Sequence, residues 1–208
     1  MRTISEIFAL SPVIPVVTID DVEQAVPLAQ ALAAGGVPII EVTLRTATAL
    51  GAIAAIAADV PEICLGVGTI WTATDLHRAI DAGAHFGVSP GATSRLLDAV
   101  VESRLPFLPG CQTASEIADR VDRGFEGVKF FPAETSGGAP ALKGLTAVFP
   151  DTSFCPTGGV KPTNARDYLG IRGVDVVGGS WLTPKDAVAA GDWSKITATA
   201  REAAALTS

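Results

Sequence analysis

The stretch Gly127-Val-Lys-Phe-Phe-Pro-Ala-Glu134 is the part of this sequence from which the fold can be worked out. It predicts a short β-strand that ends at Pro132, because proline has no backbone N–H to donate to a neighbouring strand. Side chains of a strand alternate between its two faces, so Lys129 and Phe131 share one face while Phe130 lies on the other. Apart from the lysine both faces are apolar, which is typical of a parallel sheet that is covered on both sides.

Strands of this kind recur along the chain and alternate with helical segments. Besides the strand of Lys129, the expected strands cover residues 13–18, 37–44, 63–68, 85–89, 106–109, 153–156 and 174–178. The expected helices cover residues 3–10, 20–34, 46–58, 72–82, 93–102, 113–123, 139–148, 162–169 and 193–206. Eight strands joined by helices, with no linker between them, predict an α/β fold of the (β/α)8 TIM barrel type with a short N-terminal helix, formed by a single domain over residues 1–208.

A doubly wound open sheet is the alternative architecture for alternating strands and helices. Such a sheet normally carries a glycine-rich dinucleotide-binding loop after its first strand. The corresponding segment here, Thr18-Ile-Asp-Asp21, contains no glycine, and this favours the closed barrel.

The composition narrows the range of partners and locations. The 208 residues carry a net charge of −7, which argues against nucleic acid as a partner. The apolar runs are too short to span a membrane, and the charged residues Arg2 and Glu6 interrupt the apolar segment that a signal peptide needs. We therefore expect a cytoplasmic protein with no membrane partner. The cysteines Cys64, Cys111 and Cys155 lack metal-ligand spacing and are expected to be buried free thiols, with no metal site.

Lys129 is the first candidate for chemistry. Burial disfavours the charged form of a lysine and leaves a neutral amine that can attack a carbonyl carbon, which is how a Schiff-base lysine works. The alternative is structural: the aliphatic part of the side chain packs on the neighbouring phenylalanines while the amino group reaches water.

Glu41 is the second candidate. It lies within Ile39-Ile-Glu-Val-Thr-Leu44, where a carboxylate is costly unless it is paired or catalytic. From the residues alone, structural ion pairing and catalysis are equally open for it. Arg45 follows this strand directly, and the C-terminal ends of barrel strands are where active sites form.

Glycine pairs follow the seventh and the eighth expected strands. Gly158-Gly159 comes after Thr157, and Gly178-Gly179 precedes Ser180. Barrels commonly bind a phosphate at these two loops, because bare backbone N–H groups and a helix N-terminus converge there. A tight turn is the alternative for either pair. Lys161, which comes shortly after the first pair, is either a phosphate contact or a solvated loop lysine.

Six motifs together carry a resemblance to a known family. They are Glu41-Val-Thr-Leu-Arg-Thr46, Gly66-Val-Gly-Thr69, Val88-Ser-Pro-Gly91, Val128-Lys-Phe-Phe-Pro-Ala-Glu134, Phe154-Cys-Pro-Thr-Gly-Gly159 and Gly178-Gly-Ser-Trp181. In order and spacing, from about Pro12 to the end of the chain, the sequence resembles the 2-dehydro-3-deoxy-6-phosphogluconate (KDPG) aldolases. The resemblance implies a class I lyase without metal or cofactor, usually a homotrimer, that splits this Entner-Doudoroff intermediate into pyruvate and glyceraldehyde 3-phosphate. Members often also cleave 4-hydroxy-2-oxoglutarate (KHG).

The resemblance also implies roles for individual residues. Lys129 matches the Schiff-base lysine and Glu41 the general acid/base, while Arg45 and Thr69 match the groups that hold the substrate carboxylate. The other expected contacts to the phosphorylated 2-keto acid are Pro90, Phe131 and Thr157, of which Thr157 matches the residue near the carboxylate and the hydroxyls of the substrate. The residues expected at its phosphate are Gly158, Gly159, Gly178, Gly179 and Ser180.

Three alternatives remain open at this stage. One is an aldolase for the galactonate epimer of the substrate, and the second is a phosphosugar isomerase, which would share the glycine loops but need no buried lysine. The third is a non-catalytic barrel that binds sugar phosphates, which would need neither Glu41 nor Lys129. The sequence departs from many family members at Gly110-Cys-Gln-Thr113, where a thiol follows the glycine.

Overall fold

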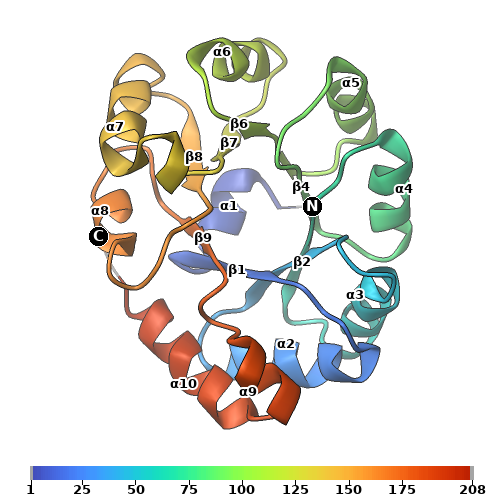
Figure 1. The fold of residues 1–208 in the computed structure, drawn as a ribbon. Helices are drawn as coiled ribbons and strands as arrows, with labels where there is room; N and C mark the ends of the chain where they lie inside the picture. The colour runs from blue at the N-terminus through green and yellow to red at the C-terminus, as the bar shows by residue number, and fades with distance from the viewer. Residues whose placement is uncertain (1, 207–208) are drawn as a thin grey trace.

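The computed structural model describes residues 2–206, which form the (β/α)8 barrel that the sequence predicts. Figure 1 shows the strands gathered in the centre of the molecule and the helices other than α1 (Ile4–Phe8) placed around them. The strands are β1 (Val13–Val17), β2 (Ile39–Thr43), β3 (Cys64–Gly68), β4 (Phe86–Val88), β5 (Phe107–Leu108), β6 (Gly110–Cys111), β7 (Gly127–Phe130), β8 (Ser153–Pro156) and β9 (Val177–Gly179). Residues 1, 207 and 208 of the expected single domain lie outside the described residues.

The strands pair in parallel and close into a ring. One sheet has the order β5-β4-β3-β2-β1-β9 and the other the order β6-β7-β8. A bridge between Thr157 and Gly178 joins β8 to β9. At the other junction β5 and β6 are two halves of one barrel strand, because Pro109 between them has no N–H for the ladder. The fifth strand thus continues beyond Pro109, where the sequence analysis ended it.

All helices but α1 lie around the outside of the barrel (Figure 1). The helices are α1 (Ile4–Phe8), α2 (Ala25–Ala34), α3 (Ala49–Asp59), α4 (Ala73–Asp81), α5 (Ser94–Ser103), α6 (Ala114–Asp122), α7 (Gly138–Val148), α8 (Ala165–Leu169), α9 (Lys185–Ala190) and α10 (Trp193–Ala204), with 3₁₀ turns η1 (Val22–Gln24) and η2 (Glu134–Ser136). Between residues 2 and 206, none of the helices combines the length and the apolar character that crossing a membrane would require.

Helices α1, α4, α5 and α6 begin within one residue of the expected position, because threonine caps fix their first turns. The hydroxyl of Thr72 accepts a hydrogen bond from the N–H of Asp75, whose carboxylate accepts one from the N–H of Thr72. Thr113 and Glu116 form the same reciprocal pair at the start of α6. Each pair satisfies two backbone N–H groups that a helix start would otherwise leave without a partner.

Other helix boundaries differ from the expectation. Residues 20–34 divide into η1, which Asp21 caps, and α2, while the helix expected over residues 162–169 begins only at Ala165. The sequence analysis missed α9 altogether. Its six residues lie between Pro184 and Gly191 and are too few to show a helical repeat of apolar residues.

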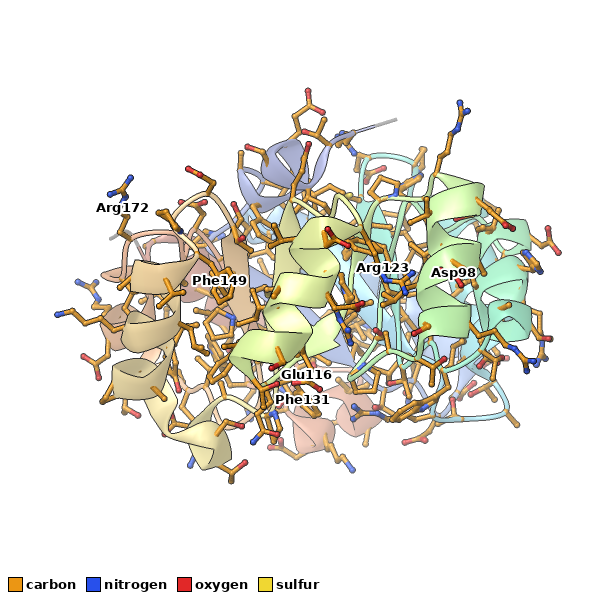
Figure 2. All side chains as sticks on the ribbon, turned by 90° about the horizontal axis from the view of Figure 1, so that it is seen from above. Asp98, Glu116, Arg123, Phe131, Phe149 and Arg172 are labelled. Carbon is orange, nitrogen blue, oxygen red and sulfur yellow. The ribbon has the colours of Figure 1, made fainter. Side chains whose placement is uncertain are left out.

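The short helix α1 covers the N-terminal end of the barrel. Its residues Ile4, Ile7 and Phe8 are buried. A Cβ on Gly127, the first residue of β7, would lie 2.7 Å from the side chain of Ile4, so α1 packs against the beginning of that strand. Figure 2 shows Phe131, just beyond the other end of β7, on the side of the molecule opposite α1. A site inside the barrel therefore has to open at the C-terminal ends of the strands.

Candidate active site

Lys129 and Glu41 face each other across the inside of the barrel. The Nζ of Lys129 on β7 lies 3.1 Å from Oε1 of Glu41 on β2 and 3.5 Å from its Oε2. The two strands are on opposite sides of the ring, so the contact runs through its interior. Both residues are buried, with exposed fractions of 4% for Lys129 and 3% for Glu41. Of the two readings of this lysine, the one in which its amino group reaches bulk water is excluded.

A glycine on the strand next to β2 makes room for the carboxylate. A Cβ on Gly68, the last residue of β3, would lie 2.1 Å from Oε1 of Glu41, well inside the van der Waals distance. A side chain at this position would therefore push the carboxylate away from Lys129. The glycine that ends β3 is thus part of the geometry of the pair.

Phe131 lies beside the amino group, as its place on the same face of the strand predicts. The Nζ of Lys129 is 5.4 Å from the centroid of the Phe131 ring. At this distance the ring face attracts a cation and also forms an apolar wall next to the amine. The side chain of Phe131 is only partly buried, so this wall borders the opening of the site.

Arg45 and Thr69 come together just beyond β2 and β3. The Nε of Arg45 donates a hydrogen bond to Oγ1 of Thr69 over 3.2 Å. Thr69 has a φ of 64°, a left-handed conformation that is costly for a β-branched residue. Strained backbone of this kind is concentrated at functional sites, where it fixes a side chain in a required direction. Arg45 is exposed, so its terminal nitrogens remain available to a carboxylate.

Thr157 lies at the end of β8, next to a glycine that it needs. A Cβ on Gly178 would lie 2.1 Å from Oγ1 of Thr157, so only glycine fits there without displacing the hydroxyl. That hydroxyl donates one long hydrogen bond of 3.4 Å to the backbone oxygen of Cys155. Burial raises the pKa of the Cys155 thiol to about 12, so this cysteine is not a nucleophile near neutral pH.

A cavity of about 640 Å³ brings most of the expected site residues together. The expected residues that line it are Arg45, Lys129, Phe131, Thr157, Gly158, Gly159, Gly178, Gly179 and Ser180. Glu41 and Thr69 are not part of its lining but bind residues that are, namely Lys129 and Arg45. Pro90 does not line the cavity; its backbone packs instead against Gly110, where an added Cβ would lie 2.2 Å away. The expected role of Pro90 thus has no direct support in this geometry.

The glycine loop after β8 has the conformation that glycine favours. Gly158 and Gly159 have φ values of 98° and 82°, which other residues rarely adopt. The N–H of Glu134 donates to the oxygen of Gly158 over 3.0 Å, which ties the loop to the segment after β7. The carboxylate of Glu134 in turn accepts a hydrogen bond from the hydroxyl of buried Tyr168 on α8. This side of the cavity is therefore built on a fixed support.

The cavity also has walls that the sequence analysis did not assign. They include Thr18, Asp20, Asp21 and Gln24 after β1, and Thr183, Lys185 and Val188 in and before α9. Lys161, by contrast, is not among the residues that line the cavity, although it follows the glycine loop in sequence. Pro184 before α9 and Gly191 after it are the sequence features that could have predicted this short helix, and with it the wall of the cavity.

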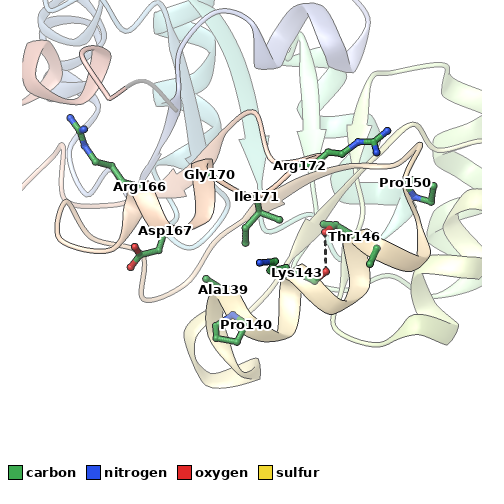
Figure 3. A pocket seen from close by; sticks show the side chains of 11 residues that line it. Ala139, Pro140, Lys143, Thr146, Pro150, Arg166, Asp167, Gly170, Ile171 and Arg172 are labelled. Atoms are coloured by element: carbon green, nitrogen blue, oxygen red, sulfur yellow. Dashed lines mark hydrogen bonds between the residues drawn. The ribbon is translucent and has the colours of Figure 1, made fainter.

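A second cavity lies on the outside of the barrel between α7 and the segment around α8 (Figure 3). It has a volume of about 830 Å³, larger than that inside the barrel, and contains none of the expected site residues. Thr146 within it donates its hydroxyl to the backbone oxygen of Lys143 over 3.2 Å. The paired ionisable groups and the glycine loops are all at the other cavity, which we therefore take as the site.

The cysteines are free thiols and buried, as expected. Across residues 2–206 no three histidine, cysteine or carboxylate side chains are grouped as metal ligands would be. The groups at the cavity that can act on a substrate include the buried amine, the carboxylate beside it, and the hydrogen-bond donors around them. An amine and a carboxylate in contact can together perform carbonyl addition and proton transfer.

Comparison with known proteins shows which family this chain resembles. The sequence matches the family described as "Aldolase: KDPG and KHG aldolase" over residues 4–199. It is 50% identical to a 2-dehydro-3-deoxy-phosphogluconate aldolase of Pseudoalteromonas atlantica over 200 aligned residues. The aligned residues cover 96% of this chain and 93% of that protein.

Two solved structures extend the similarity to the fold. KDPG aldolase from Legionella pneumophila, with pyruvate captured as a covalent carbinolamine intermediate, has a TM-score of 0.96 at 42% identity and covers 98% of this chain and 99% of its own. The aldolase of Zymomonas mobilis ZM4 with 3-phosphoglycerate has a TM-score of 0.92 at 45% identity, covering 99% of this chain and 96% of its own. The chain therefore belongs to the KDPG and KHG aldolase family.

Proposed function

We propose that this protein is a class I aldolase that cleaves 2-dehydro-3-deoxy-6-phosphogluconate into pyruvate and glyceraldehyde 3-phosphate. The observation that carries the proposal is the buried contact of 3.1 Å between the Lys129 amine and the Glu41 carboxylate inside a barrel of this family. An isomerase or a purely binding barrel needs no buried lysine beside a carboxylate. The second substrate of the family, 4-hydroxy-2-oxoglutarate, fits the same chemistry because it is also a 2-keto acid with a hydroxyl at C4.

The reaction begins with covalent capture of the ketone. The neutral amine of Lys129 adds to C2 of the substrate to give a carbinolamine, and loss of water then forms a protonated imine. Glu41 is the nearest group that can take a proton from the amine and return one to the departing hydroxyl. In the Legionella pneumophila relative a carbinolamine of the same chemical type was captured with pyruvate, the product of the cleavage.

The same carboxylate then serves the cleavage step. Glu41, directly or through a water, takes the proton of the C4 hydroxyl, the C3–C4 bond breaks, and its electron pair moves into the imine to give an enamine. Glyceraldehyde 3-phosphate leaves as the aldehyde. Glu41 returns a proton to C3 of the enamine, and hydrolysis of the resulting imine releases pyruvate and restores the amine of Lys129.

The cavity offers separate ends for the two anionic groups of the substrate. Arg45, with Thr69 bound to it, is the partner for the carboxylate. The phosphate lies at the other end, at Gly158, Gly159, Gly178, Gly179 and Ser180. The Zymomonas mobilis relative was solved with 3-phosphoglycerate, a small molecule that also carries both a carboxylate and a phosphate.

A charge placed at Ser180 tests this orientation. Ser180→Asp should raise KM for the phosphorylated substrate by about 10-fold or more, because like charges repel, and should leave KM for 4-hydroxy-2-oxoglutarate nearly unchanged. Ser180→Asn is the matched control, since asparagine is similar in size to aspartate and carries no charge. An equal loss on both substrates would reject the phosphate end at Ser180.

Three further features complete the proposal. The chain acts as one aldolase domain over residues 1–208, it works as a homotrimer as the family resemblance implies, and it is cytoplasmic because phosphorylated sugar acids do not cross membranes freely. Exposed apolar residues such as Val101 on α5 and Val121 on α6 offer surface that another copy can cover. Sedimentation of the native protein tests the trimer, and a monomeric mass rejects it. Fractionation of the source cells tests the location.

A further inference from the structure

We propose that Lys185, the first residue of α9, supplies the positive charge that binds the substrate phosphate and thereby sets the preference for phosphorylated over unphosphorylated 2-keto acids. This inference rests on the proposed function, because it assumes that the phosphate lies at the glycine loops. It adds a side-chain charge to a phosphate end otherwise made of backbone N–H groups and one hydroxyl.

The position of α9 is the first observation. Lys185 lines the same cavity as Gly158, Gly159 and Ser180. Helix α9 is the next element in the chain after β9, the strand that ends at Gly179, and it lies at the outer edge of the molecule (Figure 1). The cavity wall at this end also includes Thr183 and Val188 from the same segment.

The second observation is that the charge of Lys185 is not used within the protein. Its sequence neighbour Asp186 is already bound by Lys195, whose Nζ lies 3.0 Å from Oδ2 of Asp186. That hydrogen bond is also the main reason why the pKa of Asp186 is lowered. Among residues 2–206, Lys185 has no carboxylate within salt-bridge distance. Its side chain is exposed and free to reach towards a ligand in the cavity.

The third observation concerns the charges around the cavity. Its lining contains the cations Arg45, Lys129 and Lys185 and the carboxylates Asp20 and Asp21. The first two cations are required at the carboxylate and the carbonyl carbon of the substrate, so neither is left for the phosphate. A phosphate with a charge near −2 entering beside two carboxylates needs a positive partner, and Lys185 is the cation that remains in this lining.

Lys161 provides a matched control. It is another exposed lysine close to the glycine loop in sequence, yet it does not line the cavity. Its backbone N–H binds the side-chain oxygen of Asn164 over 2.7 Å, so its role in the loop does not depend on its amino group. Neutralising Lys161 removes the same charge from the protein as neutralising Lys185, but outside the cavity.

The experiment compares Lys185→Gln, Lys185→Arg and Lys161→Gln. We expect Lys185→Gln to raise KM for the phosphorylated substrate by about 3- to 10-fold, with kcat changed less than twofold, which is the range for a solvent-exposed ion pair with a multivalent anion. The ratio of kcat/KM between phosphorylated substrate and 4-hydroxy-2-oxoglutarate should fall by the same factor. Lys185→Arg should restore most of the ratio, and Lys161→Gln should not change it.

Salt provides a second measurement that needs only the phosphorylated substrate. Because ions screen an exposed pair, KM of the native protein should rise between 0.05 and 0.5 M sodium chloride, and KM of Lys185→Gln should rise distinctly less. Equal salt dependence in the two proteins, or an equal effect of Lys161→Gln and Lys185→Gln on KM, would overturn the assignment. If Ser180→Asp raises KM selectively and Lys185→Gln does not, the inference about Lys185 fails alone. If neither variant distinguishes the two substrates, the phosphate end itself has been placed wrongly.

Discussion

The amine of Lys129 lies 3.1 Å from the carboxylate of Glu41, although 88 positions in the sequence separate the two residues. Each side chain comes from a strand on the opposite side of the barrel, and each is almost fully buried. The contact places an amine and a carboxylate within one hydrogen bond of each other. It also gives the two residues separable tasks, which variants can distinguish.

Covalent capture should depend on Lys129 and proton transfer on Glu41. With pyruvate and borohydride the native protein should gain one reduced adduct on Lys129, and Lys129→Ala should gain none. Glu41→Gln should still trap pyruvate, while exchange of the pyruvate methyl protons with deuterated water falls by about 100-fold or more. Mass mapping and NMR measure the two effects. An adduct on Lys143, Lys161, Lys185 or Lys195 would contradict the assignment of Lys129, and native exchange in Glu41→Gln would move the base elsewhere.

Gly68→Ala should disturb proton transfer without touching either charged residue. The added Cβ would lie 2.1 Å from Oε1 of Glu41 and force the carboxylate out of its place. We expect proton exchange on pyruvate to fall by about 10-fold or more, because a shift of about 1 Å has effects of this size, while Lys129 still forms the borohydride adduct. Gly144→Ala on α7, where an added Cβ meets nothing within 4 Å, is the control. Equal exchange rates in the two variants would show that Gly68 has no part in placing Glu41.

Breaking the buried pair should cost the protein stability. Lys129→Met leaves the carboxylate of Glu41 buried without its partner, and we expect the free energy of unfolding to fall by about 3 kcal/mol. The double variant Lys129→Met with Glu41→Leu removes both charges and should recover most of that loss, since apolar replacements of buried pairs are often neutral or stabilising. Denaturant unfolding measures both values. A double variant that is no more stable than Lys129→Met would contradict the expected recovery.

Thr157 should influence which substrate epimer is cleaved. Its hydroxyl donates a long hydrogen bond of 3.4 Å to the backbone oxygen of Cys155 and lies 3.7 Å from Sγ of the same residue, so it can bind a hydroxyl of the substrate more strongly. Thr157→Val should lower kcat/KM for the gluconate-type substrate by about 10-fold or more, the cost of one lost hydrogen bond at the reacting end. Turnover of the gluconate and galactonate epimers by both proteins measures the effect. An unchanged ratio between the epimers would reject this role.

The buried thiols should resist alkylation and should limit stability at high pH. Burial raises the pKa of Cys111 and of Cys155 to about 12, whereas an unfolded cysteine titrates near 8.5. Because the pKa of each thiol is higher in the folded than in the unfolded protein, the protonated thiols add to the free energy of unfolding. That contribution is complete below about pH 8.5 and is lost as the pH rises towards 12. Iodoacetamide at pH 8 should label neither residue in the native protein and both in urea, as peptide mapping can show. Labelling of native Cys155 at the rate of the unfolded chain would contradict its burial.

The sequence by itself determined the architecture and drew attention to the two residues that form the buried pair. Alternating apolar strands and helices required a parallel sheet, and threonine caps placed the beginnings of helices such as α4 and α6 to within a residue. A lysine among phenylalanines and a glutamate among aliphatic residues stand out because burial of an unpaired charge is costly. These features are local, so they can be seen in each segment of the sequence without knowledge of its tertiary contacts.

The tertiary structure decided how those residues meet. The pairing of Lys129 with Glu41, the space that Gly68 leaves for it, and the close approach of Gly178 to Thr157 all join different strands. Such contacts depend on the relative register of strands around the closed barrel, which no single segment specifies. The cavity wall formed by α9 also depends on the tertiary structure. A helix of six residues is too short to show a clear sequence pattern, and it is too short to be stable without the barrel.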